Sequence, residues 1–305
     1  MDMQATVSQL AVLFILLALG YAGYKIKALT SETGRVLTKL ILNITLPCTI
    51  LFSVIGGQLQ IAGAETFLFL LMVILIYVIY FIIAEPTARF LVKGKDARGL
   101  YKFMLVFSNV AFMGLPVSIA IFGSEAVFYV AIFNIPFWIA SLSYGVMMIS
   151  GKKGAFHPKA FLNPSLLASL LVIPIALSGF RAPDIVLEAV RLTGNITTPA
   201  SMIIIGVTLA QTPIRDVFTQ WRLYPLVFIK LVIIPLVVWL IFRSFIQSDL
   251  VLGVLVILSG MPTAAIAAMF AIEYKNNENT ASSGVFLTTL LSGVTIPLIV
   301  FFLLV

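Results

Sequence analysis

The amino-acid sequence predicts an all-α polytopic membrane protein whose ten transmembrane helices form two inverted five-helix repeats. Three observations carry this prediction. The 305 residues are 61% hydrophobic and only 10% charged, which is outside the range of ordinary soluble domains. Apolar runs long enough to span a bilayer recur along the whole chain. Short motifs of the first half also return in the second.

The apolar runs define the predicted spans in order. They lie at 7–24, 36–55, 67–84, 103–122, 127–149, 161–179, 190–209, 223–242, 250–272 and 283–305. The first run lacks the basic flank of a signal peptide, so we interpret it as a span. Thr30-Ser31-Glu32 suits a helix start before the second span. Asn163-Pro164 suits one before the sixth, with asparagine as the N-cap.

Two motifs occur twice, almost half a chain apart. Asn43-Ile-Thr-Leu-Pro47 returns as Asn195-Ile-Thr-Thr-Pro199, and Gly114-Leu-Pro116 returns as Gly260-Met-Pro262. This pattern indicates a duplicated unit. Because each half contains an odd number of spans, the second copy is inverted in the membrane. We therefore expect a first repeat at 1–150, a short cytoplasmic connection at 151–160 and a second repeat at 161–305.

The net charge of +7 has a one-sided distribution. Basic residues gather after the odd-numbered spans, at Lys25, Lys27, Arg35, Lys39, Arg89, Lys93, Lys95, Arg98, Lys102, Lys152, Lys153, Lys159, Arg215, Arg222 and Lys275. The opposite connections carry only Arg181, Arg191 and Arg243. By the positive-inside rule, the odd-to-even connections are cytoplasmic and both termini are extracytoplasmic. The charge thus indicates topology in a cell membrane and a lipid-bilayer partner, not nucleic acid.

The Gly-x-Pro motifs predict interrupted helices in the fourth and ninth spans. Within a bilayer, interrupted backbone is tolerated only where protein or a water-filled cavity satisfies the freed groups. Paired breaks in corresponding positions of two halves point to a transporter's binding site. A half-helix that starts at such a break offers free N–H groups and a positive dipole end, which favours an anion such as a carboxylate. The candidate substrate-binding residues here are Gly114, Pro116, Ser259, Gly260, Pro262 and Thr263.

Polar side chains inside the spans are further candidates. Asn109, Asn134, Asn43 and Asn195 are expected to be buried amides that contact substrate or bond to carbonyls freed beside the prolines. Lys230 falls within the eighth span, where a lysine costs about 2.5–3.5 kcal/mol at a helix centre. It could snorkel to the cytoplasmic surface, provide a counter-charge for an anionic substrate, or act as a structural partner.

Several function classes are disfavoured. Each of the 12 acidic residues falls in a loop or at a span end, whereas a proton pump or cation antiporter normally needs a carboxylate inside the membrane. His157 is the only histidine and Cys48 the only cysteine, and no metal-ligand or nucleophile motif occurs. We expect no enzymatic activity, no metal and no cofactor.

The sequence resembles the auxin efflux carrier family, in particular its short bacterial organic-acid permeases. The matching segments are Gly20-Tyr-Ala-Gly-Tyr-Lys25, Leu42-Asn-Ile-Thr-Leu-Pro47, Ser108-Asn109 through Gly114-Leu-Pro116, Phe133-Asn134 and Asn163-Pro164. The resemblance implies crossing of the broken fourth and ninth helices, a homodimer, a scaffold of spans 1, 2, 6 and 7, and an elevator-like transport domain of spans 3–5 and 8–10. It also implies that Asn109, Pro116 and Pro262 mark the substrate site. The long hydrophilic loop of many plant members is missing here.

These observations together predict a secondary active transporter of small organic anions, such as carboxylates or auxin-like acids. One alternative is a sodium-coupled symporter of the related bile-acid type. A second, from another class, is a membrane sensor or scaffold that binds its ligand without translocating it.

Overall fold

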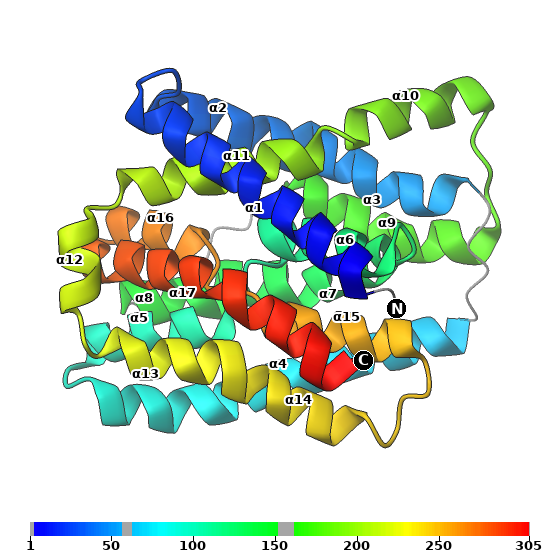
Figure 1. Cartoon of the computed structure of the whole chain (residues 1–305). Coiled ribbons are helices and arrows are strands. Elements are labelled where there is room, and N and C mark those ends of the chain that lie inside the picture. Colours follow the sequence, from blue (N-terminus) through cyan, green and yellow to red (C-terminus); the bar gives the residue numbers. More distant parts are fainter. Residues whose placement is uncertain (1–2, 57–62, 152–161, 305) are drawn as a thin grey trace.

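The structure is a computed structural model that describes residues 3–56, 63–151 and 162–304, and these residues fold almost entirely into helices (Figure 1). Seven helices are long and apolar enough to cross a membrane, and three shorter apolar helices accompany them. This confirms the prediction of an all-α membrane protein. Most of the predicted connection at 151–160, with His157, lies outside the described residues.

The first half contains α1 (Met3–Lys25), α2 (Ser31–Leu40), the π-helical turn η1 (Ile41–Thr45), α3 (Leu46–Ile55), α4 (Gly63–Leu91), α5 (Lys95–Val106), η2 (Val110–Gly114), α6 (Leu115–Phe122), α7 (Ala126–Ala140), η3 (Ser141–Gly145) and α8 (Val146–Ser150). The second half contains α9 (Pro164–Ser178), α10 (Asp184–Gly194), α11 (Thr197–Gln211), α12 (Ile214–Thr219), α13 (Leu223–Phe228), η5 (Ile229–Ile233), α14 (Ile234–Phe242), α15 (Asp249–Ser259), α16 (Ile266–Glu273), α17 (Glu278–Ile299) and η6 (Val300–Leu304).

Both predicted helix starts are confirmed by their caps. The Thr30 hydroxyl accepts a hydrogen bond from the Thr33 N–H at 3.2 Å, and the Thr33 side chain reciprocates to form a capping box. The Asn163 side chain accepts a bond from the Ser165 N–H at 2.9 Å at the start of α9. Local sequence thus determines where these helices begin.

Three prolines each lie two residues after the end of a π-helical turn. Pro47 follows η1, Pro116 follows η2 and Pro235 follows η5. A proline in a helix interior removes one N–H donor and clashes with the preceding turn, and a locally wider turn accommodates both effects. The prolines therefore shift the helix register without ending the helix.

Several helices extend beyond the predicted apolar runs; for example, α5 begins at Lys95 and α10 at Asp184, upstream of the predicted starts at 103 and 190. The helix that covers the third span continues past residue 84 to Leu91 and contains Pro86, because the polar residues 85–89 continue the same helix beyond the apolar run. The short helix α12 between the seventh and eighth spans was not predicted.

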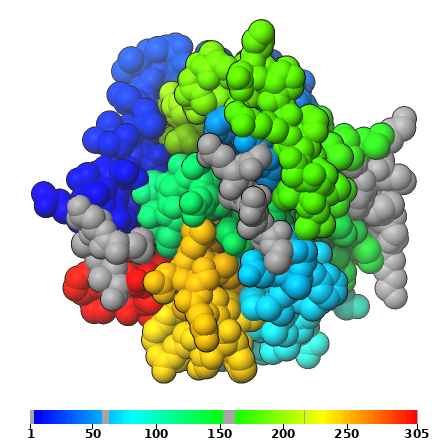
Figure 2. Space-filling model, turned by 90° about the vertical axis from the view of Figure 1, so that its right-hand side faces the viewer, coloured from blue at the N-terminus to red at the C-terminus, as the bar shows by residue number. Residues whose placement is uncertain are grey.

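In the part of the chain that the structure describes, the connections from odd-numbered to even-numbered predicted spans lie at one end of the bundle. In Figure 1 the α1–α2, α4–α5 and α16–α17 connections, together with α12, lie on the left, and the α9–α10 and α14–α15 connections lie on the right. Figure 2 looks onto the right-hand end, where α15 lies directly against α6. A Cβ atom on Gly253 of α15 would come within 2.3 Å of the Phe122 ring, so this end is closely packed.

Helices α1 and α11 pack closely against each other, and glycines lie at their points of contact. A Cβ atom on Gly20 would lie 2.1 Å from the Ile203 carbonyl oxygen, and one on Gly206 would lie 2.0 Å from that of Leu17. Small residues allow this close approach of helix backbones in membranes. Lys25 at the end of α1 donates to the Ala210 carbonyl at the end of α11 at 3.0 Å.

Candidate substrate site at the helix crossing

Two helices, one from each half of the chain, are interrupted by short extended segments, and these segments cross each other. The first interruption, residues 107–109, separates α5 from η2, and the second, residues 260–265, separates α15 from α16. The Asn109 N–H donates to the Pro262 carbonyl at 2.7 Å, and the Ala264 N–H donates to the Phe107 carbonyl at 2.9 Å. Ser108 and Thr263 form an antiparallel bridge between them. The two breaks therefore satisfy each other's backbone groups, as their position in a membrane helix requires.

The break in the first half lies at the upstream end of the predicted segment Ser108–Pro116, and not beside the proline as the Gly-x-Pro motif suggested. Helical structure resumes at Val110, six residues before Pro116. The π-helical turn η2 places Pro116 in the first turn of α6, where its missing N–H is tolerated. Pro262, in contrast, lies inside the second break and supplies one of the bridging carbonyls.

Side chains from the second half cap the carboxyl end of α5. The last carbonyls of a helix have no partner within it and carry the negative end of the helix dipole. The Thr263 hydroxyl donates to the Met104 carbonyl at 3.0 Å, and Lys230 Nζ donates to the Leu105 carbonyl at 2.7 Å. The Thr263 N–H donates to the Thr288 hydroxyl at 3.1 Å, so α17 also holds the crossing.

Lys230 is the only charged side chain with no exposed surface among the described residues. Its ammonium also donates to the Ser108 hydroxyl at 2.7 Å and lies 5.3 Å from the centroid of the Tyr80 ring. The snorkelling alternative is therefore wrong, because the ammonium points into the crossing rather than toward an aqueous surface. Its direct partners are a helix-terminal carbonyl, a hydroxyl and an aromatic face.

Tyr80 of α4 connects the two breaks. Its hydroxyl donates to Ser259 Oγ at 2.8 Å, and Ser259 Oγ donates to the Leu255 carbonyl at 2.6 Å near the end of α15. The same tyrosine thus contacts Lys230 with its ring and α15 with its hydroxyl. Tyr80, Ser108 and Thr288 were not predicted as site residues, because a lone hydroxyl in an apolar span is too common to single out. Ser108 does adjoin the predicted residue Asn109.

Gly114 and Gly260 allow the surrounding helices to approach closely. A Cβ atom on Gly114 would lie 2.7 Å from Leu258 Cδ2, and one on Gly260 would lie 2.7 Å from Ile299 Cδ1. Both glycines are buried. Both glycines pack around the crossing without a polar side chain, and the Gly114 N–H donates to the Asn109 carbonyl at 2.9 Å.

Asn109 and Asn134 are both buried, with exposures of 3% and 1%. Within the described part of the chain, no hydrogen bond is formed by the Asn109 side chain, although its backbone takes part in the crossing. The Asn134 amide nitrogen donates to the Val130 carbonyl at 3.1 Å, and its Oδ1 atom has no partner. Asn134 belongs to α7, which packs against η2 and α15. Both residues retain unused hydrogen-bonding capacity beside the crossing.

Asn43 does not join this group. It is exposed in η1, which packs against α9, α10 and α11, and Asn195 of the second copy is also exposed. The prediction that these amides are buried is wrong, because the π-helical turn orients Thr45 inward and Asn43 outward. The contact between these regions comes instead from Thr49, two residues after the first motif: its hydroxyl lies 2.8 Å from that of Thr197 in the second motif and 2.9 Å from the Gly194 carbonyl.

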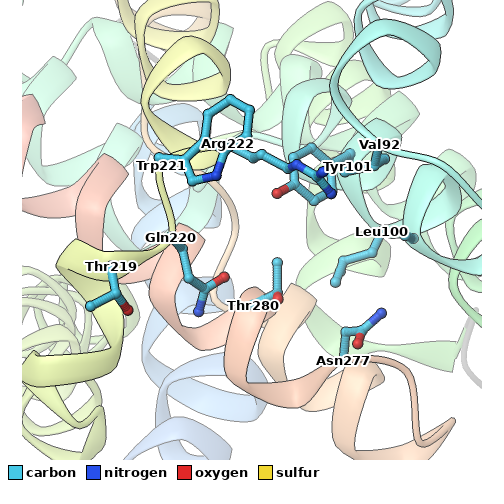
Figure 3. A pocket seen from close by; sticks show the side chains of 10 residues that line it. Val92, Leu100, Tyr101, Thr219, Gln220, Trp221, Arg222, Asn277 and Thr280 are labelled. Carbon is cyan, nitrogen blue, oxygen red and sulfur yellow. The ribbon is translucent and has the colours of Figure 1, made fainter.

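Two cavities at the surface lie away from the crossing. One, of about 370 Å³, lies among α5, the α12–α13 connection and the start of α17. Figure 3 shows Arg222 and Tyr101 on one side of it and Asn277 and Thr280 on the other. Another, of about 430 Å³, lies among α4, α5 and the η3–α8 segment. Neither is lined by a predicted site residue.

Comparison with known proteins agrees with this architecture. The sequence model of the membrane transport protein family, the auxin efflux carrier family, matches residues 5–160 and 155–300. The chain belongs to this family. It is 24% identical over 298 residues to an uncharacterized transporter of Methanocaldococcus jannaschii, with 94% of this chain and 95% of the relative covered. It is 28% identical over 306 residues to an uncharacterized transporter of Methanothermobacter thermautotrophicus, with 97% of each covered.

Family membership confirms that the protein is a multi-pass membrane transporter and not an enzyme. Within the described residues, no group of three or more His, Cys, Asp or Glu side chains could hold a metal ion. The residues that remain to be explained are therefore those of the crossing.

Proposed function

We propose that this transporter is a secondary carrier of small organic anions, such as carboxylates or auxin-like acids, and that it binds them at the crossing of the broken helices. The observation that carries the proposal is the buried ammonium of Lys230, which has no carboxylate partner among the described residues. A buried charge without a counter-ion is costly, and an anionic substrate reduces that cost. The downstream helical segments, which begin at Val110 and Ile266, add positive dipole ends at the same place.

The proposed substrate site comprises Asn109, Asn134 and Lys230, together with the break residues Ser259, Pro262 and Thr263. Asn109 has an amide available to hydrogen-bond a carboxylate, and Asn134 has an unpaired acceptor that suits a hydroxyl or protonated group of the substrate. Gly114, Gly260 and Pro116 shape the site through backbone geometry. Asn43 is left out because it is exposed outside the crossing.

The proposal includes ten spans in two inverted repeats, at 1–150 and 161–305. The seven long and three shorter apolar helices support this number, and the boundary between the two family matches falls within the connection at 151–160. Clustering of the basic odd-to-even connections at one end supports extracytoplasmic termini. An elevator-type motion of spans 3–5 and 8–10 against a scaffold of spans 1, 2, 6 and 7, in a homodimer, completes the proposal. Packing of α11 against α1 and α2, and of α3 against α9 and α10, supports such a scaffold.

Transport by purified protein in liposomes tests the proposed function. A panel of radiolabelled mono- and dicarboxylates is offered to the wild type, to Asn109→Ala and to Asn195→Ala as the matched control at an exposed asparagine. We expect saturable carboxylate flux in the wild type and the control, and at least about a tenfold loss in Asn109→Ala, equivalent to about 1.4 kcal/mol of binding. Equal flux in both variants would remove Asn109 from the site. Ligand-induced thermal stabilisation without flux in the wild type would favour a sensor instead.

A further inference from the structure

We propose that the Lys230 ammonium takes the place of a coupling cation, so that transport through the crossing does not depend on sodium. The inference rests on the proposed function, because it concerns the site at which the substrate is carried. It assigns to one side chain the charge that a bound ion supplies in sodium-coupled carriers. It also bears on the sodium-coupled alternative raised by the sequence.

The partners of the ammonium are those of a cation site. Its contacts are the Leu105 carbonyl at the carboxyl end of α5, the hydroxyl of Ser108 in the break, and the face of the Tyr80 ring. In carriers with discontinuous helices, unwound carbonyls and the carboxyl ends of half-helices coordinate sodium. The ammonium of Lys230 uses the same kind of oxygen atoms, at 2.7 Å from each.

Neighbouring oxygens at this end of α5 are also occupied. The Met104 carbonyl accepts from the Thr263 hydroxyl, and the Phe107 carbonyl accepts from the Ala264 N–H. A sodium ion would therefore have to displace hydrogen bonds that hold the crossing together. It would also lie beside a positive charge, with no carboxylate among the described residues to screen it, and Coulomb repulsion opposes this in a low-dielectric interior.

The local backbone explains how Lys230 reaches this place. The residue lies in η5, the π-helical turn before Pro235, and the wider turn alters the direction of its side chain relative to a regular helix. Such turns inside α-helices occur frequently at functional sites. The cation therefore comes from the eighth span in the second half and binds a helix end in the first half.

Thermal unfolding in sodium chloride and in choline chloride, at equal ionic strength, tests the inference without requiring a known substrate. The wild type should unfold at the same temperature in both salts. Lys230→Ala should gain a sodium-specific rise of about 3 °C at saturating sodium, because it exposes the oxygen atoms and leaves room for the ion. Lys230→Met fills the same space without a charge and should respond to neither salt. Lys95→Ala, at an exposed lysine of α5, is the control for loss of charge alone.

Flux is then measured for the carboxylate that the wild type carries, with and without a sodium gradient. Equal rates support the inference. Sodium-accelerated flux or sodium-specific stabilisation of the wild type would overturn it, as would a folded Lys230→Ala variant that does not respond to sodium. If that variant does not fold, the wild-type measurements decide. Absence of carboxylate flux would contradict the proposed function alone, because the unfolding comparison still reports on the cation site.

Discussion

Replacement of Thr263 by valine tests whether side chains from the second half hold the end of α5. Valine has nearly the shape of threonine and retains the backbone N–H that donates to Thr288. It removes the hydroxyl that donates to the Met104 carbonyl at 3.0 Å, in a site where Thr263 has no exposed surface. The carbonyl then lies unpaired in an apolar interior.

The cost follows from this geometry. Interhelical hydrogen bonds in membranes contribute about 0.6 kcal/mol on average and up to about 1.7 kcal/mol. A buried acceptor left without a partner adds to that value, so we expect a loss of about 1–2 kcal/mol in the free energy of unfolding. At about 2 °C per kcal/mol for a large domain, the unfolding temperature should fall by about 2–4 °C.

The assay is thermal unfolding in detergent, followed by tryptophan fluorescence. Thr208→Val is the matched control, because its hydroxyl donates only within its own helix, to the Ile204 carbonyl at 2.9 Å, and its loss strands no helix end. Thr263→Ser should restore most of the stability, since it keeps the hydroxyl. If Thr263→Val unfolds at the same temperature as Thr208→Val, the hydroxyl does not hold the crossing and the reasoning fails.

Two further predictions concern the packing of the helices around the site. Gly206→Ala should abolish folding or severely reduce the yield of monodisperse protein in size-exclusion chromatography, because the added Cβ atom would lie 2.0 Å from the Leu17 carbonyl oxygen. Gly56→Ala is the control: its added Cβ atom has its nearest contact at 3.9 Å, so the variant should behave as the wild type. Thr49→Val should lower the free energy of unfolding by about 1–2 kcal/mol in the thermal unfolding assay, because the Thr49 hydroxyl bonds to Thr197 and to the Gly194 carbonyl. A change no larger than that of Thr208→Val would mean that this contact with the second repeated motif contributes little to stability.

Much of the architecture was predictable because it follows from local rules. Long apolar runs specify helices in a bilayer, and the caps at Thr30 and Asn163 depend on residues within three positions of each other. The Gly-x-Pro pair located the breaks to within one or two helical turns. The π-helical turns were not predictable, because they depend on how each proline is accommodated by tertiary packing.

Side-chain partners at the site were harder to predict than their positions. The sequence indicated that Lys230 is costly within a span, but it could not separate snorkelling, a counter-charge for substrate and a structural role. The distinction depends on the position of the carboxyl end of α5, whose Leu105 carbonyl accepts from the ammonium. Tyr80 had no sequence signal, because its contacts with Lys230 and Ser259 come from distant spans. Asn43 was misjudged because a one-residue change of helix register exposes it. Residue spacing along the sequence cannot predict contacts that form only where distant segments cross.

The bonding at the crossing has a mechanical consequence for the proposed elevator motion. Backbone bonds at 2.7 and 2.9 Å, together with the caps from Lys230 and Thr263, join the broken helices of both halves into one unit. By contrast, the contacts of α11 with η2 and α6 include no hydrogen bond between residues that the structure describes. Sliding along such a surface breaks few specific bonds, whereas separating the two breaks would leave several buried polar groups unpaired. We therefore expect α5, η2, α6, α15 and α16 to move together, carrying the substrate between the two sides.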